Sequence, residues 1–480
     1  MTTADKIKFG TEGWRGIIAD DFIFENVAKV SSAIAKCLKQ TSLSAQPPAR
    51  LPAILVGYDN RFLSEKFAYI SGKIFSDNGF NVLISSTSVS SPNLCHFIRS
   101  NNSVGIMITA SHNPPQFNGL KIKASYGGPA PDYFNKEVEK TIQNEKFSYN
   151  YENNWTPDFS DIKPSYIEYL KLSADFYFIR KIKDKIVLDA MNGCAGNYFD
   201  SLFDSKNRTI KLRANRDPIF GGSNPEPIEK NLTQLKKTVL EQKASIGLAF
   251  DGDADRLGVI DDRGRYLPPH IVFPLLLYYL AEYKKLSGKV LQTISLGYLS
   301  KRIAQEYNLP FEETPVGFKY LTEKMLKENV LIAGEESGGY AVCGEILDRD
   351  GILSGLVLIE MLGFTKKKLS MLVDELQKKY GKTYFKRIDL HISEIIYDKK
   401  EFLEKIVNLI HKKIDKISVK EVKTFDGIKI ILEDDSWLLL RPSGTEPLLR
   451  IYSESQNKKQ TENLINFGIK IIKERGLIKR

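Results

Sequence analysis

The chain has few cysteines, and their arrangement indicates neither a disulfide framework nor a zinc site. Four cysteines are scattered through 480 residues, and no two form a C-x-x-C pair. They are Cys37, Cys95, Cys194 and Cys343. Such usage is typical of reduced thiols in a cytoplasmic protein. The first residues also lack the apolar core of a secretory signal peptide, so we expect a cytoplasmic location.

Long apolar runs and nucleic-acid-binding modules are lacking as well. The most apolar stretch, residues 271–281, is about half of what a membrane-spanning helix requires. The formal charge is +10, but much of the lysine excess falls in helix-like stretches such as 366–368, where a solvated helix face explains it. No reader module for nucleic acid accompanies this charge. We expect neither a membrane nor a nucleic acid as partner, and small phosphorylated molecules suit the basic balance.

The chain is too long for one ordinary domain. Its 480 residues suggest about three or four units, and its 42% apolar and 27% charged residues are ordinary for globular proteins. Polar stretches that contain proline or glycine, at 144–164, 261–269 and 378–382, mark the expected boundaries. The predicted units are therefore 1–155, 156–263, 264–379 and 380–480.

One pattern recurs along the first three units. A short apolar run ends at a turn rich in glycine or aspartate, and a helix-like stretch follows. The runs are 51–57, 104–110, 186–190, 246–250 and 330–333. Continuous apolar runs that alternate with helical periods predict α/β layers with buried strands. From residue 384 onward the pattern instead suits a small α+β unit, and polar residues after the strands occupy the edge where open α/β sheets bind ligands.

Three aspartates alternate in the turn after the run 246–250. Asp251, Asp253 and Asp255 project to one side of an extended turn, and the small residues between them let the backbone bend. An EF-hand loop is an alternative, but Arg256 occupies its required glycine position and the flanks read as strands. Crowded carboxylates repel each other without a cation. The segment therefore predicts a site for a hard divalent cation such as Mg²⁺.

Ser111 lies in the turn after the run 104–108, which would expose it at the end of a strand. A serine nucleophile needs activation by a base or by positive charge. The chain lacks a G-x-S-x-G elbow, which disfavours a serine hydrolase. A plain turn, with side chains capping backbone groups, stays open as an explanation. Lys121, ten residues on, is either a proton-transfer group or charge clamp, or a solvated lysine.

Two later segments suit a sugar phosphate. Residues 441–445, with Arg450 close behind, combine arginines, hydroxyls and an accessible glycine amide, which make a cradle for a phosphate dianion. Residues 334–339 place carboxylates and a hydroxyl on a glycine-rich loop, as sugar hydroxyls require. Taken alone, each segment is also compatible with an ordinary turn.

A fifth segment, residues 9–16, contains three glycines and Arg15 and is uninformative alone. Taken in their order along the chain, the five segments resemble the α-D-phosphohexomutase family, which includes phosphoglucomutases and phosphomannomutases. The resemblance runs from Phe9 to about Tyr452. It implies three similar α/β domains with mixed sheets and a smaller C-terminal α+β domain, arranged around a central cleft. It also implies interconversion of hexose 1-phosphate and hexose 6-phosphate through a phosphoserine enzyme, with Mg²⁺ as cofactor. The intermediate, hexose 1,6-bisphosphate, would serve as activator.

The resemblance implies a role for each matching residue. Ser111 would carry the phosphate and share Mg²⁺ with Asp251, Asp253 and Asp255. Lys121 would be the general acid/base, and His112 and Arg15 would lie near the transferring phosphate. The implied substrate-binding residues are Arg256, Lys319, Glu335, Ser337, Arg441, Ser443, Gly444, Thr445 and Arg450.

The preferred sugar is less clearly marked. The Glu-Glu-Ser sequence at 335–337 is nearer that of phosphoglucomutases than the Glu-Met-Ser of dual glucose/mannose enzymes or the Glu-Gln-Ser of phosphoglucosamine mutases, so we favour glucose. Phosphomannomutase and phosphoglucosamine mutase are the alternatives within the family. A metal-dependent sugar phosphatase would lack the second phosphate cradle, and a non-catalytic binder would have lost Ser111 or an aspartate of the metal loop. We expect a monomer or a dimer.

Overall fold

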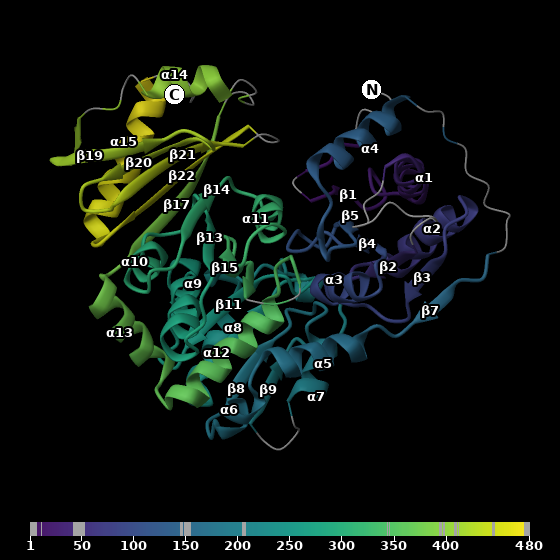
Figure 1. Ribbon diagram of the computed structural model, residues 1–480, viewed down its shortest axis with the longest axis horizontal. Coiled ribbons are helices and arrows are strands. Elements are labelled where there is room, and N and C mark those ends of the chain that lie inside the picture. Colours follow the sequence, from purple (N-terminus) through teal and green to yellow (C-terminus); the bar gives the residue numbers. More distant parts are fainter. Residues whose placement is uncertain are drawn as a thin grey trace.

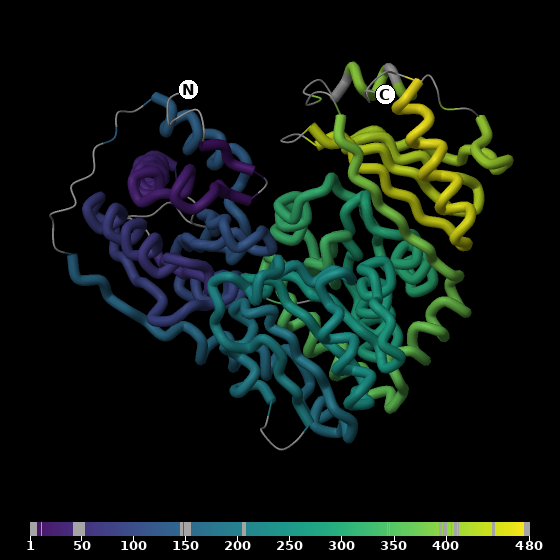
Figure 2. The backbone as a smooth tube through the Cα atoms, turned by 180° about the vertical axis from the view of Figure 1, so that it is seen from behind, coloured from purple at the N-terminus to yellow at the C-terminus, as the bar shows by residue number. Residues whose placement is uncertain are grey.

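The computed structural model describes residues 7–10, 12–41, 53–144, 147, 155–203, 208–342, 344, 346–392, 396, 399–407, 410, 412–443 and 447–474. They form four sheets with their helices, and Figure 1 shows the first and last units side by side above the two middle ones. Seen from behind in Figure 2, the chain runs from the first unit through the two middle ones to the last. Among the described residues, no helix is long and apolar enough to cross a bilayer.

The first sheet has the strand order β1-β5-β4-β2-β3-β7, with β6 paired to β5. Its strands β2, β3, β4 and β7 run parallel, β5 pairs antiparallel with β4, and β1 pairs antiparallel with β5. The strands are β1 (Trp14–Ile17), β2 (Ile54–Tyr58), β3 (Val82–Ser85), β4 (Val104–Ile108), β5 (Phe117–Ala124), β6 (Gly128–Pro129) and β7 (Asp158–Ser160). The helices are α1 (Phe24–Gln40), α2 (Ser64–Asp77), α3 (Ser91–Ser100) and α4 (Asp132–Asn144). Helix α1 buries Val27, Val30, Ile34 and Leu38, whose spacing of three and four residues puts them on one face.

The second sheet has the order β12-β11-β10-β8-β9 and also mixes parallel and antiparallel pairs. Its strands are β8 (Ile186–Asp189), β9 (Thr209–Leu212), β10 (Ile246–Phe250), β11 (Leu257–Asp261) and β12 (Tyr266–Leu267). Its helices are α5 (Lys163–Ser173), α6 (Phe176–Lys181), α7 (Gly196–Leu202) and α8 (Thr233–Glu241), with short 3₁₀ turns η2 (Phe220–Gly222) and η3 (Glu229–Asn231).

The third sheet has the order β14-β13-β15-β16 and is mixed as well. Its strands are β13 (Lys289–Thr293), β14 (Phe311–Thr314), β15 (Val330–Gly334) and β16 (Tyr340–Val342). Its helices are α9 (Pro269–Tyr278), the π-turn η4 (Tyr279–Tyr283), α10 (Leu299–Glu306), α11 (Phe318–Met325), α12 (Gly351–Thr365) and α13 (Leu369–Tyr380). Helix α12 is apolar all round and contacts β10, β11 and β16, so one core continues through the second and third units.

The last unit is a six-stranded antiparallel sheet in the order β17-β22-β21-β20-β19-β18. Its strands are β17 (Tyr384–His391), β18 (Lys413–Ile414), β19 (Ile417–Lys423), β20 (Ile428–Leu432), β21 (Trp437–Pro442) and β22 (Leu448–Ser455). Its helices are α14 (Lys399–Val407) and α15 (Lys458–Glu474). The predicted fold of three mixed α/β units and a C-terminal α+β unit is confirmed, whereas the proposed boundaries between units stay predictions.

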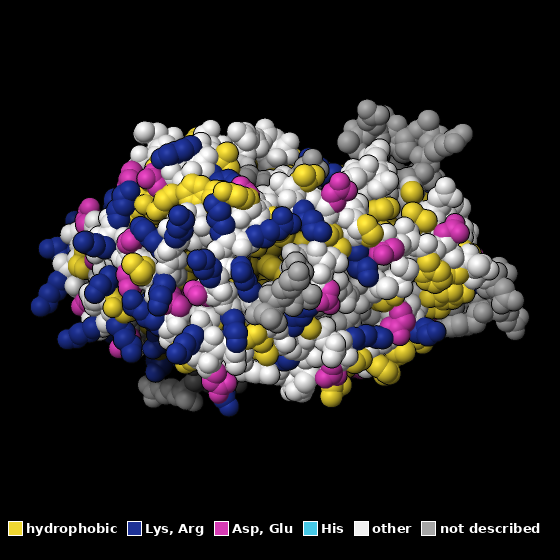
Figure 3. Space-filling model, turned by 90° about the horizontal axis from the view of Figure 1, so that it is seen from below, with side chains coloured by type: hydrophobic (Ala, Val, Ile, Leu, Met, Phe, Trp, Pro, Cys, Tyr) yellow, Lys and Arg dark blue, Asp and Glu magenta, His cyan; other side chains and the backbone are white. Residues whose placement is uncertain are grey.

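Basic side chains are unevenly distributed over the surface. On the underside shown in Figure 3, lysine and arginine side chains gather on the left of the view, where acidic and uncharged ones lie between them. Lys366 and Lys368, at the end of α12, are exposed to solvent, as expected of a solvated face.

Ion pairs join the third and fourth units. Glu313 on β14 accepts bonds from the Nζ atoms of Lys423 and Lys429, each at 2.8 Å. A second pair joins Arg302 to Asp435, with 2.8 Å between Nη2 and Oδ2. Burial works to raise the pKa of Glu313, but Lys429 and Lys423 outweigh it and lower that pKa to about 2.

The ion pairs of Glu313 with Lys423 and Lys429 predict that the stability of the fold depends on pH. The pKa of Glu313 lies below its ordinary value of 4.5, so the pair stabilises the fold above pH 4.5 and loses this effect as the pH falls toward 2. We expect the wild type to lose about 1–3 kcal/mol more than Glu313→Gln across that window. Calorimetry of both proteins at a series of pH values measures this difference. Equal slopes for the two proteins would contradict the prediction.

Candidate functional site

Ser111 lies at the end of β4, against the metal loop of the second unit. Its φ is 52°, in the left-handed region, and its side chain is buried. The Oγ donates to Oδ2 of Asp251 at 2.7 Å, and Nδ1 of His112 is 3.3 Å from the same Oγ. The backbone N–H of Ser111 donates to Oγ1 of Thr109 at 2.8 Å. The turn thus presents the serine hydroxyl to a carboxylate 140 residues along the chain.

Arg61 clamps the backbone of the Ser111 turn, and sequence reasoning missed it. Its buried guanidinium donates to four backbone carbonyls of the turn and of β5. The acceptors are the oxygens of Ser111 (2.7 Å), Asn113 (2.6 Å), Pro114 (2.8 Å) and Phe117 (3.0 Å). Charge-assisted bonds of this kind are about twice as strong as neutral ones. The turn is therefore held by one side chain from outside its own segment.

Asp59 completes this clamp. Its Oδ2 lies 3.2 Å from Nε of Arg61 and accepts from Oγ1 of Thr109 at 2.6 Å. Its Oδ1 accepts from Oγ of Ser64 at 2.9 Å. Asp59 and Arg61 both follow the buried strand β2. Polar residues directly after a buried strand are the sequence signal that could have predicted this clamp.

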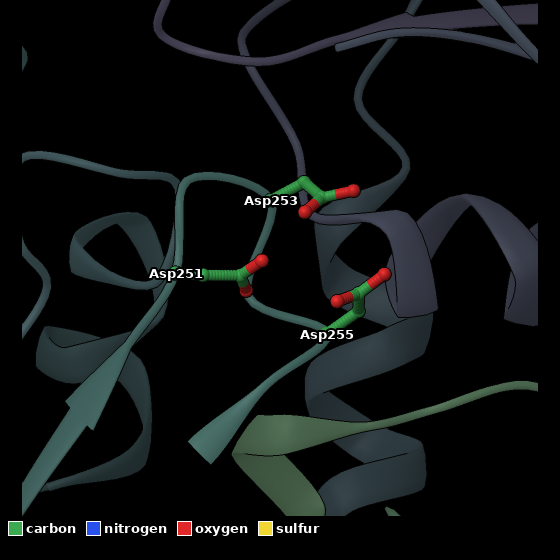
Figure 4. A group of neighbouring side chains, drawn as sticks. All are labelled: Asp251, Asp253 and Asp255. Atoms are coloured by element: carbon green, nitrogen blue, oxygen red, sulfur yellow. The ribbon is translucent and has the colours of Figure 1, made fainter. Parts of the chain in front are cut away.

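The three aspartates of the metal loop follow β10, and all are buried (Figure 4). One oxygen from each lies within 4.8 Å of the others. Burial raises the pKa of Asp251, and the neighbouring Asp255 and Asp253 raise it further. The Oδ1 atoms of Asp253 and Asp255 are buried and have no hydrogen-bond partner among the described residues. Three buried carboxylates this close together, two of them with an unsatisfied oxygen, fit a hard divalent cation such as Mg²⁺.

Lys121 on β5 contacts the same carboxylates. Its Nζ lies 2.8 Å from Oδ2 of Asp253, 3.3 Å from Oδ2 of Asp255 and 3.6 Å from Oε2 of Glu12. Lys121 is only 2% exposed, so it is not the solvated lysine that the sequence left open. Burial works to lower its pKa, but Asp253 and Asp255 outweigh burial and raise it. The side chain is therefore a buried ammonium beside the metal loop.

Arg349 is the second residue that sequence reasoning missed. Its Nη2 donates to Oδ2 of Asp255 at 2.8 Å and also to Glu12, while its Nη1 donates to Oε2 of Glu335 at 3.2 Å. A Cβ atom at Gly339 would lie 2.1 Å from Cδ of Arg349. The arginine thus occupies the room that a side chain at 339 would need. In the sequence it stands only within Asp348-Arg349-Asp350, a charged run with no motif spacing.

Glu335 joins two loops of the third unit: the glycine-rich loop at 334–339, which the sequence predicts to bind the sugar (the sugar loop), and the loop at 315–317 before α11. Its Oε1 accepts from the backbone N–H of Gly317 at 3.1 Å, and Oγ of Ser337 lies 3.5 Å from its Oε2. Burial raises the pKa of Glu335. Lys319, which follows in α11, forms an ion pair with Asp132 of the first unit at 2.5 Å.

The predicted phosphate cradle lies on β21 and β22. The register places Arg441 directly opposite Arg450, so both side chains project from one face of the sheet. Nε of Arg441 donates to Oδ2 of Asp426 at 2.8 Å, and Nε of Arg450 lies 3.9 Å from Oδ2 of Asp389. Ser443 is buried at the end of this segment. Gly444 and Thr445 lie outside the described residues, and their roles stay predictions.

The remaining predicted residues lie beside Ser111. Nη1 of Arg15, on β1, donates to Oδ1 of Asn113 at 2.5 Å. The backbone N–H of Arg256 donates to Oδ1 of Asp251 at 3.0 Å. Burial lowers the pKa of His112 well below its ordinary value, and Arg256 and Arg15 lower it further. The imidazole is therefore neutral among cations.

Comparison with known proteins covers nearly the whole chain. Family models of the phosphoglucomutase/phosphomannomutase α/β/α domains I, II and III match residues 6–149, 164–264 and 268–380, and the model of the C-terminal domain matches 397–467. A phosphoglucomutase/phosphomannomutase of Thermococcus kodakarensis is 32% identical over 475 residues, which cover 97% of this chain and 98% of the relative. A phosphoglucosamine mutase of Methanocaldococcus jannaschii is 32% identical over 384 residues, or 78% of this chain and 82% of the relative.

Comparison with solved structures leads to the same family. The crystal structure of a putative phosphomannomutase from Thermus thermophilus matches with a TM-score of 0.84 at 29% identity, covering 98% of this chain and 99% of that one. The chain therefore belongs to the phosphoglucomutase/phosphomannomutase family of hexose-phosphate mutases.

Proposed function

We propose that this enzyme interconverts glucose 1-phosphate and glucose 6-phosphate through phosphorylated Ser111 and glucose 1,6-bisphosphate. One observation carries the proposal: the Ser111 hydroxyl lies 2.7 Å from Asp251, at the edge of a buried cluster of three carboxylates that Lys121 contacts. A phosphatase needs a nucleophile and a cation as well, but it does not need two opposed arginines on a separate unit. Arg441 and Arg450 provide that second anion site.

The cation would be held by Asp251, Asp253 and Asp255, together with an oxygen of the phosphorylated serine. Mg²⁺ bound there would offset the negative charge of the transferring phosphate. The unsatisfied oxygens of Asp253 and Asp255 support this assignment.

In the first half-reaction the free hydroxyl of the sugar phosphate attacks the phosphorus of phospho-Ser111. A bond from phosphorus to the sugar oxygen forms as the bond to Oγ breaks, and the net proton movement is from the sugar hydroxyl to Oγ. Lys121 is the group we assign to relay this proton, because its buried ammonium lies beside the metal loop that Ser111 contacts. Arg15 and Arg256 add positive charge near the transferring phosphate.

In the second half-reaction the bisphosphate presents its other phosphate to Ser111, which is then phosphorylated again. The phosphate that does not react is held by Arg441 and Arg450, whose guanidinium groups bind phosphate dianions well. Glu335 and Ser337 bind the sugar hydroxyls in both orientations. Added glucose 1,6-bisphosphate is the activator because it phosphorylates Ser111 in any enzyme molecule that has lost its phosphate.

The Glu-Glu-Ser sequence at 335–337 supports glucose, whereas several relatives are phosphoglucosamine mutases, which makes glucosamine 1-phosphate the main competing substrate. Coupled assays with the 1-phosphates of glucose, mannose and glucosamine, in the presence of Mg²⁺ and a trace of the matching bisphosphate, test the preference. We expect kcat/KM to be at least about tenfold higher for glucose, which is within what a few sugar contacts supply. A higher value for another sugar would overturn the preference for glucose. No turnover of any of the three would overturn the mutase assignment.

A further inference from the structure

A tight turn in the fourth unit presses a carboxylate against the phosphate cradle. Asp426 and Gly427 form the turn between β19 and β20. Gly427 has a φ of 89°, and a Cβ there would lie 2.5 Å from the carbonyl oxygen of Leu440 and 3.0 Å from Cα of Arg441. Glycine is required on both counts. The Asp-Gly pair therefore brings the side chain of Asp426 next to Arg441.

One oxygen of Asp426 joins two units of the enzyme. Its Oδ2 accepts from Nε of Arg441 at 2.8 Å and from the backbone N–H of Val316 at 2.8 Å. Arg441 belongs to the fourth unit, and Val316 belongs to the loop before α11 in the third. Asp426 is only 6% exposed, so both bonds are largely shielded from water.

The same loop continues to the sugar-binding residues. The backbone N–H of Gly317, next to Val316, donates to Oε1 of Glu335 at 3.1 Å. Glu335 in turn accepts from Arg349, which donates to Asp255 of the metal loop at 2.8 Å. The peptide bond between Val316 and Gly317 thus joins two sets of polar contacts into one path from the predicted phosphate cradle to the metal loop, and in this path Asp426 crosses between the third and fourth units.

We infer that Asp426 is a positioning residue, which holds Arg441 and the loop at 316–317 in one relative geometry. The inference rests on the proposed function. A bond to Nε fixes the plane of the guanidinium and therefore the direction of its two Nη groups. In the proposed mechanism the substrate binds in two orientations. In each orientation Arg441 must bind the phosphate that does not react, at the same distance from Ser111. A carboxylate shared between the cradle and the sugar loop sets that distance.

The variant Asp426→Asn tests this role, because it keeps the shape of the side chain and removes its charge. We expect KM for glucose 1-phosphate to rise at least about tenfold, the scale of one charge-assisted bond, with a smaller change in kcat. The matched control is Asp435→Asn, which breaks the Arg302–Asp435 pair between the same two units without touching Arg441. We expect its KM to stay within about twofold of wild type.

A double variant separates positioning from a general structural role. If Asp426 acts through Arg441, then adding Asp426→Asn to Arg441→Gln raises KM little further, whereas independent effects multiply. If Asp426→Asn does not fold, Asp426→Glu replaces it, because the extra methylene displaces the carboxylate from Arg441 and is expected to raise KM likewise. An unchanged KM, or multiplying effects, would overturn the inference. Inactive wild-type enzyme would overturn the proposed function instead.

Discussion

Ser111→Ala is expected to lose at least about 10⁴-fold in kcat, because the proposed mechanism places the phosphate on the Oγ of Ser111, which alanine lacks. The expectation follows from the site: the Oγ of Ser111, on the turn after β4, donates to Oδ2 of Asp251 in the metal loop at 2.7 Å. Alanine fits the buried position without a clash. The loss is therefore chemical, and the protein stays folded.

The direct measurement is transfer of labelled phosphate from glucose 1,6-bisphosphate to the protein. Wild type is expected to retain label after denaturation, and Ser111→Ala is expected to retain none. Ser165→Ala is the control, since Ser165 is exposed on α5 and its Oγ donates to the carbonyl of Ile162, in the same unit and within three residues along the chain. Labelled Ser111→Ala protein would place the phosphate on another residue.

Arg61→Met is expected to have the second largest effect, on stability and turnover together. Methionine fills similar volume but leaves the buried Asp59 without its cation and the carbonyls of the Ser111 turn without their donors. Breaking one partner of a buried pair costs about 3–5 kcal/mol of unfolding free energy. We expect kcat to fall at least about 100-fold as well, because a misplacement of about 1 Å is enough for that loss. Denaturant unfolding and steady-state assays measure the two effects.

Arg216→Met is the matched control for Arg61→Met. Arg216 also bonds to the backbone near Arg61, but its ion pair with Glu65, at 2.9 Å, is largely exposed. Such pairs contribute about 0–1 kcal/mol. Asp59→Asn added to Arg61→Met is expected to restore part of the stability and none of the activity, because the clamp on the turn stays absent. Equal stability of Arg61→Met and Arg216→Met would contradict the clamp.

Most of the fold was predictable because its buried strands are continuous apolar runs. The runs 51–57, 104–110, 186–190, 246–250 and 330–333 correspond to β2, β4, β8, β10 and β15. Strand β5 was not predicted because it buries Lys121 and Lys123. A lysine in a sequence normally indicates a solvent-exposed position unless its buried ion-pair partner is known. Those partners, Asp253 and Asp348, come from other units.

The same reason explains what was missed in the site. The positions of Ser111 and of the aspartates, each in the turn after a buried strand, could be predicted because each motif is local. Arg61 and Arg349 act through acceptors far along the chain, and an arginine outside a motif is ordinarily taken for a surface residue. That Ser111 and Asp251 meet followed only from the resemblance to a family, since 140 residues separate them and nothing local pairs them.

The left-handed backbone of Ser111 bears on how such enzymes evolve. Its φ of 52° costs a residue with a side chain roughly 1 kcal/mol that glycine would not incur. Glycine at this position therefore relaxes the backbone of the turn, but it also removes the Oγ that donates to the buried carboxylate of Asp251. The surroundings thus hold the proposed nucleophile in a strained backbone conformation, and a buried carboxylate depends on that residue for a hydrogen bond.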